Sequence, residues 1–203
     1  MSDYTIRREE AADYAAIENL VREAFWNVYQ PGCSEHYILH CFRGAADFVP
    51  ELDLVMEKGG EIFGQIMYVR AEIELDGGGK IPIMTFGPMS IAKKFQRQGY
   101  GLKLLIESME RAKKMGVGAL AITGNIDFYG KAGFVIAKSR NIFYADEPEA
   151  DYFLIKELAP DFLNGVTGIF HTPEGYFVEA AAVDEFDKKF PAKQKLKLPS
   201  QIF

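Results

Sequence analysis

The sequence has no long apolar run, few cysteines and no excess of basic residues, and each absence excludes a class of protein. No apolar segment among its 203 residues approaches the roughly 20 residues that a membrane-spanning helix requires. The N-terminal residues MSDYTIRREE lack the apolar core of a secretory signal peptide. We therefore expect a cytoplasmic protein with no membrane partner.

Charge and cysteine usage narrow the choice further. The formal net charge is -6, and no nucleic-acid partner is expected because an acidic chain binds nucleic acid poorly. The two cysteines, Cys33 and Cys41, belong to no CxxC or Cys/His ligand pattern. His36 and His40 lie at helical spacing beside Cys41, but no His-x-Glu or paired-cysteine signature accompanies them. We predict reduced thiols, although a disulfide stays open, and no metal.

What remains is the composition of an ordinary globular protein. Hydrophobic residues make up 48% of the chain and charged residues 26%, which is enough apolar mass for a core. The length suits one domain of generous size, or a domain with an appendage.

Hydrophobic periodicity predicts two helices and an antiparallel meander of strands. Residues 12–25 have apolar side chains at helical spacing, and Ser34 is a suitable N-cap for a helix running to Phe42. The predicted strands, separated by turns, are 4–7, 52–57, 61–75 and 81–91. Gly87-Pro88 interrupts the last strand. We expect that strand to bulge or part from a neighbour there, because proline cannot donate to a ladder.

A second run of elements follows. Residues 101–115 return to the helical period, with Leu102, Leu105, Ile106 and Met109 as the predicted buried stripe. The other predicted elements are a strand at 119–123, one or two helical turns at 126–132, strands at 134–137 and 152–158, and a hairpin joining 166–170 to 176–178.

The most informative segment is the loop that leads into that helix, Gln96-Arg97-Gln98-Gly99-Tyr100-Gly101-Leu102. The first N–H groups of a helix have no internal partner and lie at the positive end of its dipole. Glycines let the backbone approach a ligand closely. Together these properties are typical of a phosphate site.

The surrounding charge agrees with an anionic ligand. Residues 93–114 contain seven basic and two acidic side chains, although the whole chain has a net charge of -6. On these features alone, a tight turn before a helix with solvated lysines is an equally good interpretation. The segment is not a P-loop, because no Gly-Lys-Ser/Thr follows, and not a dinucleotide fingerprint, because the third glycine is missing.

Two motifs resemble those of the GNAT superfamily of N-acetyltransferases. Gln96–Gly101 matches its Gln/Arg-x-x-Gly-x-Gly/Ala motif, and the preceding Gly87–Ile91 is similar to its fourth strand. Asp127–Phe134 resembles the closing Tyr-x-x-x-Gly-Phe element and follows the predicted strand at 119–123. The resemblance extends over roughly residues 4–158.

The resemblance implies an α/β (α+β) fold, with a mixed, mostly antiparallel central sheet that is flanked by helices and splayed at strands 4 and 5. Residues 1–158 would form an acetyl-CoA-dependent acyltransferase domain. Residues 159–203 carry no motif that we can assign, and we expect this extension to pack on the same domain. The implied reaction moves the acetyl group of acetyl-CoA, as co-substrate, to a primary amine of a small molecule or amino-acid-like acceptor.

The resemblance also assigns roles to individual residues. In similar proteins the loop holds the CoA pyrophosphate, which here implies cofactor binding by Gln96, Arg97, Gln98, Gly99, Tyr100, Gly101 and Leu102. The pantetheine arm would pair with the backbone of Met89 and Ile91, and an N–H near Met89 or Ser90 would polarise the thioester carbonyl. Tyr129 takes the position of the general acid that protonates the departing thiolate, and Phe128 would contact the cofactor. Packing of both aromatic rings in the core is the alternative.

The acceptor amine must lose a proton before it attacks. For a lysine-like amine of pKa ~10.4, the neutral form costs roughly 4.6 kcal/mol at pH 7. Related enzymes often place a Glu on or near the fourth strand, but residues 81–91 contain no carboxylate. Glu72, Glu74, Asp127 and His171 are the remaining candidates for a base, and we predict instead that the proton leaves through water.

Two other functions stay open. The missing carboxylate favours a catalytically silent acyl-CoA sensor on the same fold, and the lysine-rich tail favours a protein N-acetyltransferase whose partner docks there. An acidic stretch either rims a cleft for a cationic acceptor or is a solvated face; it comprises Asp146, Glu147, Glu149 and Asp151. Dimers are common among similar proteins, so a homodimer is also left open.

Overall fold

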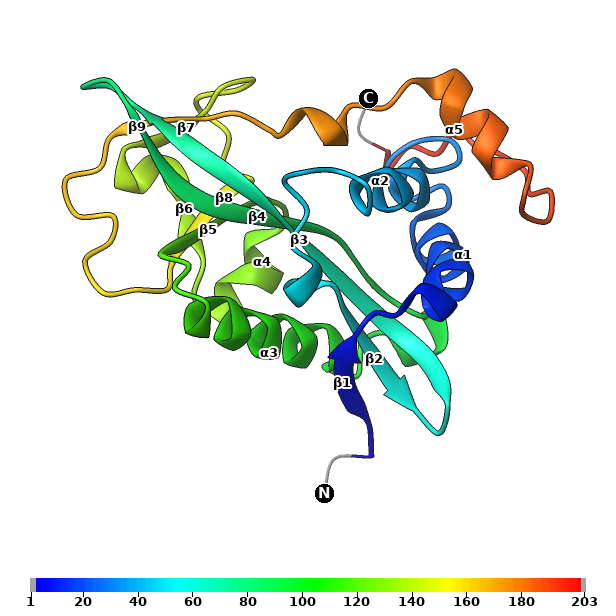
Figure 1. Ribbon diagram of the computed structural model, residues 1–203. Coiled ribbons are helices and arrows are strands. Elements are labelled where there is room, and N and C mark those ends of the chain that lie inside the picture. Colours follow the sequence, from blue (N-terminus) through cyan, green and yellow to red (C-terminus); the bar gives the residue numbers. More distant parts are fainter. Residues whose placement is uncertain (1–2, 202–203) are drawn as a thin grey trace. The chain divides into compact units, whose positions relative to one another are not determined.

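The computed structural model describes residues 3–201, which form two compact units. Unit 1 contains the residues up to 67, residues 88–104 and those from 174 onward, and unit 2 contains 68–87 and 105–173. Three elements, which are labelled in Figure 1, begin in one unit and end in the other: β3 Glu61–Leu75, β4 Lys80–Ile91 and α3 Tyr100–Lys114.

Unit 1 combines a small antiparallel sheet with three helices. Its other elements are β1 Thr5–Arg8, α1 Tyr14–Phe25, α2 Glu35–Phe42, β2 Leu54–Lys58 and α5 Ala180–Asp187. Arg8 pairs with Leu54, and Leu54 pairs in turn with Ile66 of β3. The helix α1 buries Ile17 and Val21 completely, which is the face that its periodicity predicts.

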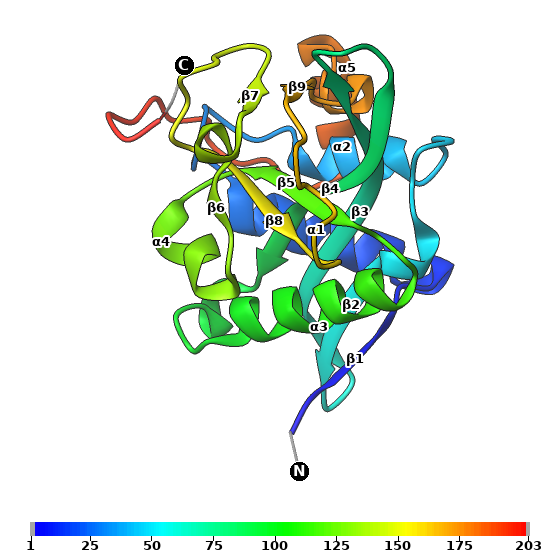
Figure 2. The ribbon, with the colours of Figure 1, turned by 90° about the vertical axis from the view of Figure 1, so that its left-hand side faces the viewer.

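Unit 2 contains the short strands that follow α3. They are β5 Ala119–Thr123, β6 Val135–Ile136, β7 Ile142–Tyr144, β8 Phe153–Glu157 and β9 Gly168–Phe170, with the short helix α4 Ile126–Tyr129 after β5. Figure 2 shows β8, in yellow, beside β5, in green, and the two pair antiparallel along all five residues of each.

Short 3-10 turns occur in both units. They lie at Ala11–Asp13, Pro50–Leu52, Lys93–Phe95, Gly130–Ala132, Ala137–Arg140 and Glu174–Tyr176.

The strands follow one hydrogen-bonded order, β1-β2-β3-β4-β5-β8-β6, while β9 pairs with β3 and with β7. β4–β5 and β7–β9 are parallel, and β1–β2, β2–β3, β3–β9, β5–β8 and β6–β8 are antiparallel. The predicted mixed, mostly antiparallel sheet is therefore confirmed. The β4–β5 ladder contains only Met84↔Leu120 and Thr85↔Ala121, and it ends just before Gly87-Pro88, where the bulge is predicted.

Of the predictions from periodicity, one was wrong in part and one entirely. In α3, Leu105 and Met109 are buried as predicted, but Ile106 is 44% exposed and Leu104 is buried instead. The predicted hairpin of 166–170 with 176–178 does not form, because β9 pairs with β3 and β7 instead. The helix α5 was not predicted.

No helix within residues 3–201 is both long and apolar enough to cross a membrane.

Candidate functional site

The glycine loop joins the end of β4 to the start of α3. A 3-10 turn at Lys93–Phe95 follows the strand, and the helix begins at Tyr100. Arg97 and Gly99 both have positive φ, of 59° and 82°, which turns the chain sharply before the helix. The N–H of Lys103 donates to the Gly99 carbonyl at 3.1 Å, so the helical hydrogen bonds start at Gly99.

The backbone amides of residues 97–102 are the chemically distinctive part of this loop. Within residues 3–201, none of their N–H groups has a hydrogen-bond partner. Residues 96–99 are exposed, and residues 100–102 are partly exposed. Unpaired amides at the start of a 15-residue helix create a positive, accessible surface, because the helix dipole adds to the partial charges of the N–H groups. An anion fits such a surface.

Side chains stabilise the loop in this conformation. Gln96 Nε2 donates to the Ile91 carbonyl at 2.9 Å, and Gln98 Nε2 donates to the Lys94 carbonyl at 2.9 Å. The Tyr100 ring packs edge-on against Phe63, with centroids 5.0 Å apart. Because both glutamine side chains bond to the loop itself, the groups that remain for a ligand are those of the backbone.

The basic residues around the loop differ in how far they are neutralised. Lys94 Nζ lies 2.6 Å from Glu61 Oε1. In the described part of the chain, Lys93 and Arg97 have no carboxylate within 4.0 Å. The ammonium group of Lys103 lies over the Tyr100 ring at 5.2 Å. The positive charge nearest the unpaired amides is therefore not cancelled by protein carboxylates.

The end of β4 is held by a residue that the motifs do not reveal. Gln65 of β3 is fully buried, and its amide, in the orientation that satisfies both ends, donates to the Pro88 carbonyl at 3.2 Å and accepts from Met67 N–H at 3.3 Å. This contact stabilises the strand at the predicted bulge. In the sequence, the signal that could have revealed Gln65 is its polar side chain in the middle of an otherwise apolar strand. Ser90 is 4% exposed, and its Oγ has no partner among the described residues.

In unit 2, Tyr129 lies at the end of α4 within a cluster of aromatic rings. Its ring centroid is 5.8 Å from that of Phe86, 5.7 Å from that of Phe134 and 5.0 Å from that of Phe128. A Cβ added to Gly124 would lie 2.3 Å from Tyr129 Cε2. The glycine after β5 is therefore required for the ring to lie where it does.

The predicted site residues fall into two groups. Met89 to Leu102 belong to unit 1, and Phe128 and Tyr129 belong to unit 2. The arrangement in unit 1 is a strand end, a tight loop and a helix start that exposes its amides. The family profile for an acetyltransferase (GNAT) domain matches residues 5–137.

The chain belongs to the GNAT acetyltransferase family. It is 25% identical over 165 residues to the uncharacterized N-acetyltransferase YhbS of Escherichia coli strain K12, which covers 81% of this chain and 93% of YhbS. The crystal structure of E. coli YhbS in complex with CoA superposes with a TM-score of 0.75 at 23% identity, covering 86% of this chain and 92% of that one. A Brucella melitensis GNAT acetyltransferase in complex with acetyl-CoA superposes with a TM-score of 0.68 at 24% identity, covering 86% and 98%.

The candidate bases of this GNAT acetyltransferase are all solvent-exposed. Glu72 is paired with Lys80, and Glu74 Oε2 lies 3.6 Å from His171 Nε2. Asp127 lies in the first turn of α4, where its backbone N–H donates to Asn125 Oδ1 at 2.7 Å. None of these carboxylates is held in a desolvated position that would prepare it to take a proton.

The acidic stretch is partly neutralised by its own neighbours. Lys138 Nζ lies 3.3 Å from Glu149 Oε2 and 3.0 Å from Asp151 Oδ1. The Tyr152 hydroxyl donates to Glu147 Oε2 at 2.7 Å. Across residues 3–201, no three His, Cys, Asp or Glu side chains are arranged to hold a metal ion.

Proposed function

We propose that this chain transfers the acetyl group of acetyl-CoA to the primary amine of a small molecule or an amino-acid-like acceptor. The observation that carries the proposal is the set of unpaired amide N–H groups at residues 97–102, which suits a pyrophosphate. The crystal structures of E. coli YhbS with CoA and of the B. melitensis enzyme with acetyl-CoA support the same donor here.

The proposed binding follows the chemistry of the donor. The pyrophosphate accepts hydrogen bonds from the amides of residues 97–102, and Lys93 and Arg97 add positive charge beside them. The pantetheine amides pair with the backbone of Met89 and Ile91, at the end of β4 that Gln65 stabilises. An N–H near Met89 or Ser90 polarises the thioester carbonyl.

The proposed reaction is direct attack. The amine nitrogen forms a bond to the thioester carbon, the carbon–sulfur bond breaks, and the CoA thiolate takes a proton from the Tyr129 hydroxyl. The proton of the attacking amine leaves through water, because Glu72, Glu74 and Asp127 are all exposed. Phe128 contacts the cofactor beside Tyr129.

The first test is thioester consumption. Purified protein is mixed with acetyl-CoA and a panel of primary amines, and the release of CoA thiol is measured. We expect turnover with at least one small amine. Tight CoA binding with no release across the panel would instead support the silent sensor, whose best evidence is the absence of a carboxylate at residues 81–91.

The second test concerns the general acid. Tyr129→Phe keeps the ring against Phe86 and Phe134 but removes the hydroxyl, so kcat should fall about 100-fold while the Kd for CoA stays unchanged. Tyr144→Phe is a matched control, since it removes a hydroxyl that bonds Thr172 Oγ1 at 2.9 Å and should leave kcat intact. Full turnover by Tyr129→Phe would remove Tyr129 from the mechanism.

The contacts of the tail do not favour the protein acetyltransferase. Lys193 Nζ lies 2.9 Å from Glu23 Oε2, while Lys188 and Lys195 pair with Glu185 and Asp184. These lysines are engaged within the chain and are poor recognition elements for an acidic partner.

A further inference from the structure

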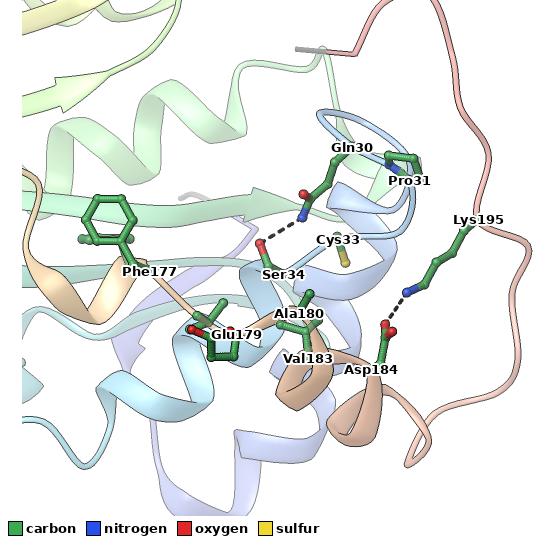
Figure 3. Close-up of a pocket in the computed structure, with 12 residues that line it drawn as sticks. Gln30, Pro31, Cys33, Ser34, Phe177, Glu179, Ala180, Val183, Asp184 and Lys195 are labelled. Carbon is green, nitrogen blue, oxygen red and sulfur yellow. Dashed lines mark hydrogen bonds and ion pairs between the residues drawn. The ribbon is translucent and has the colours of Figure 1, made fainter. Parts of the chain in front are cut away.

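Unit 1 contains a pocket between the loop that joins α1 to α2 and the segment that leads into α5. Its volume is about 370 Å³, which suits a small organic molecule. In Figure 3, Gln30 and Ser34 of the loop lie above Glu179 and Ala180. The apolar part of the lining comprises Pro31, Phe177, Val178, Ala180 and Val183.

One aromatic ring of this lining is left uncovered. Phe177 is 67% exposed, which is more than any other large apolar side chain within residues 3–201. The preceding Tyr176 instead packs edge-on against Phe42, with ring centroids 4.7 Å apart. Exposed apolar surface is unfavourable in water, and the face of a phenyl ring attracts both apolar groups and cations. A bound molecule with either group would cover the ring.

Two carboxylates line the pocket, and they differ in how far they are neutralised. Asp184 pairs with Lys195, which also lines the pocket (Figure 3). Glu179 is the N-cap residue of α5, but its side chain makes no capping hydrogen bond. In the part of the chain that the structure describes, no cation lies within 4.0 Å of its carboxylate. Two carboxylates and one ammonium leave the lining with one negative charge, which belongs to Glu179.

The loop supplies a further acceptor to the lining. Gln30 Nε2 donates to Ser34 Oγ at 3.2 Å, and among the described residues the Gln30 amide oxygen has no hydrogen-bond partner. An ammonium group has three N–H donors, so a single carboxylate does not satisfy it. Glu179 and the Gln30 amide oxygen are two acceptors for these donors, and the third donor can keep a water molecule.

We propose that this pocket binds small primary amines in their protonated form, with the ammonium group paired to Glu179 and the carbon skeleton against Phe177 and the apolar lining. An amine of pKa ~10.4 carries a positive charge at pH 7. An unpaired carboxylate attracts that charge and repels an anion. The apolar lining adds affinity in proportion to the carbon surface that it covers. The pocket therefore selects a molecule by its charge and its apolar group together.

This ligand class is the one that the proposed function gives to the acceptor. A role of the pocket in holding the acceptor rests on that function, whereas the binding of an ammonium group does not, since the loop at residues 97–102 contributes none of the lining. Binding is therefore measured without acetyl-CoA. If no amine releases CoA thiol while an ammonium still binds here, the transfer reaction is contradicted and the site is not.

The test compares benzylammonium, benzyl alcohol and benzoate, which share a phenyl ring and differ in charge. Each is titrated into the isotope-labelled protein, and the backbone amide shifts are followed by NMR. Benzylammonium should bind about fivefold more tightly than benzyl alcohol, and benzoate more weakly than both. The amides that shift should be those of residues 30–34 and 177–180. The advantage of benzylammonium should shrink at high salt.

Two substitutions should change the affinity in opposite directions. Glu179→Gln removes the unpaired carboxylate and should weaken benzylammonium binding about fivefold, while the binding of benzyl alcohol stays unchanged. Lys195→Met frees Asp184 and should tighten benzylammonium binding about twofold. A loss of structure would instead weaken both ligands in either variant. Glu174→Gln is the matched control for charge, since Glu174 is exposed and does not line the pocket.

Ala180→Trp is an independent check, because it fills the pocket without changing a charge. Ala180 is exposed in the first turn of α5, so the variant should fold, and circular dichroism verifies this. It should abolish the binding of benzylammonium and benzyl alcohol alike. The proposal is overturned if benzylammonium at about 10 mM shows no binding, if it binds no better than benzyl alcohol, or if the shifted amides lie elsewhere. Equal losses in Glu179→Gln and Glu174→Gln would overturn it as well.

Discussion

Two regions of unit 1 place polar groups in opposite ways: the loop at residues 97–102, and a cluster in which the buried Arg22 and His36 face the partly exposed Asp187. The loop exposes backbone N–H groups that have no partner among the described residues. In the cluster, the Arg22 side chain is 1% exposed and donates to Asp187, which is 165 residues away in the chain. The loop leaves polar groups unpaired where water or a ligand reaches them, whereas the cluster pairs most of its buried polar groups, Arg22 Nη1 and His36 Nε2 being the exceptions.

The cluster satisfies most of the hydrogen-bond donors of Arg22, although its Nη1 has no hydrogen-bond partner among the described residues. Arg22 also donates to the Pro191 carbonyl at 3.1 Å, and its guanidinium lies 4.2 Å from the centre of the Trp26 ring. Although burial opposes it, the hydrogen bond from Arg22 holds the pKa of Asp187 below its usual value. The loop is held by the side chains of Gln96, Gln98 and Tyr100 rather than by a buried ion pair, and we propose that it contributes to binding more than to stability.

The largest effect should come from breaking the cluster. Arg22→Ala leaves the partly exposed Asp187 without its partner and empties the space of a buried side chain, and the free energy of unfolding should fall by about 3 kcal/mol. Urea denaturation measures the change. Lys188→Ala, at the C-cap of α5 and in an exposed pair with Glu185, is the control and should cost less than about 0.5 kcal/mol. A loss below about 1 kcal/mol in Arg22→Ala would mean that the cluster is hydrated.

The second-largest effect is the pH dependence of the free energy of unfolding that His36 causes. His36 in the unfolded chain binds a proton below about pH 6.5, but in the folded chain only near pH 4. The unfolded state therefore holds more protons between these values, and stability falls as the pH drops from 6.5 to 4, by up to about 3 kcal/mol. His36→Gln should remove this part of the slope in urea denaturation at pH 7, 5.5 and 4.5. Parallel slopes for both proteins would contradict the assignment.

A smaller effect is expected in the loop and should appear in binding. Gly99→Ala forces a side chain into the left-handed region and should raise the Kd for acetyl-CoA about tenfold, since it displaces the amides, while costing ~1 kcal/mol of stability. Gly116→Ala is the matched control. Gly116 has a φ of 87°, and a Cβ at either glycine meets nothing within 4 Å. Titration calorimetry should show weaker acetyl-CoA binding for Gly99→Ala and unchanged binding for Gly116→Ala.

The smallest effect concerns the charge beside the loop. Arg97→Ala should weaken acetyl-CoA binding about fivefold, or ~1 kcal/mol, and the difference should shrink at high salt. Lys113→Ala, in the last turn of α3, removes the same charge far from the amides and should leave the Kd unchanged. Equal losses in the two variants would show that only the net charge of the helix matters.

Local patterns predicted the elements better than their faces. The bounds of β3 and β5 are as predicted, and those of α3 differ by one residue at each end. The predicted buried face of α3 was wrong at Ile106, because the neighbours of a helix select the face that is buried. A Cβ on Gly64 would lie 2.8 Å from Ile91 Cδ1 and 3.5 Å from Leu104 Cδ2, so Ile91 fills the space that this glycine leaves and Leu104 packs in contact beside it. Periodicity gives a helix several candidate faces, and the packing partner chooses among them.

The tail was predicted poorly for a related reason. A hairpin was expected because two apolar segments flank a turn sequence, but β9 pairs with β3, and Gly168 lies opposite Leu75. A Cβ on Gly168 would be 2.1 Å from the Glu74 carbonyl oxygen. Pairing with a strand that is distant in sequence leaves little local trace. The division into a domain of residues 1–158 and an extension of residues 159–203 that packs on it stays a prediction.

The sequence by itself determined the glycine loop, the strand before it and the helix after it. Unpaired amides at a helix start are a property of consecutive backbone groups, and so they can be read from neighbouring residues. Only the tertiary structure brought Arg22 and His36 together with Asp187 and placed Gln65 against Pro88. Those contacts depend on which distant segments pack side by side, and packing is decided by the burial of whole faces rather than by any local motif.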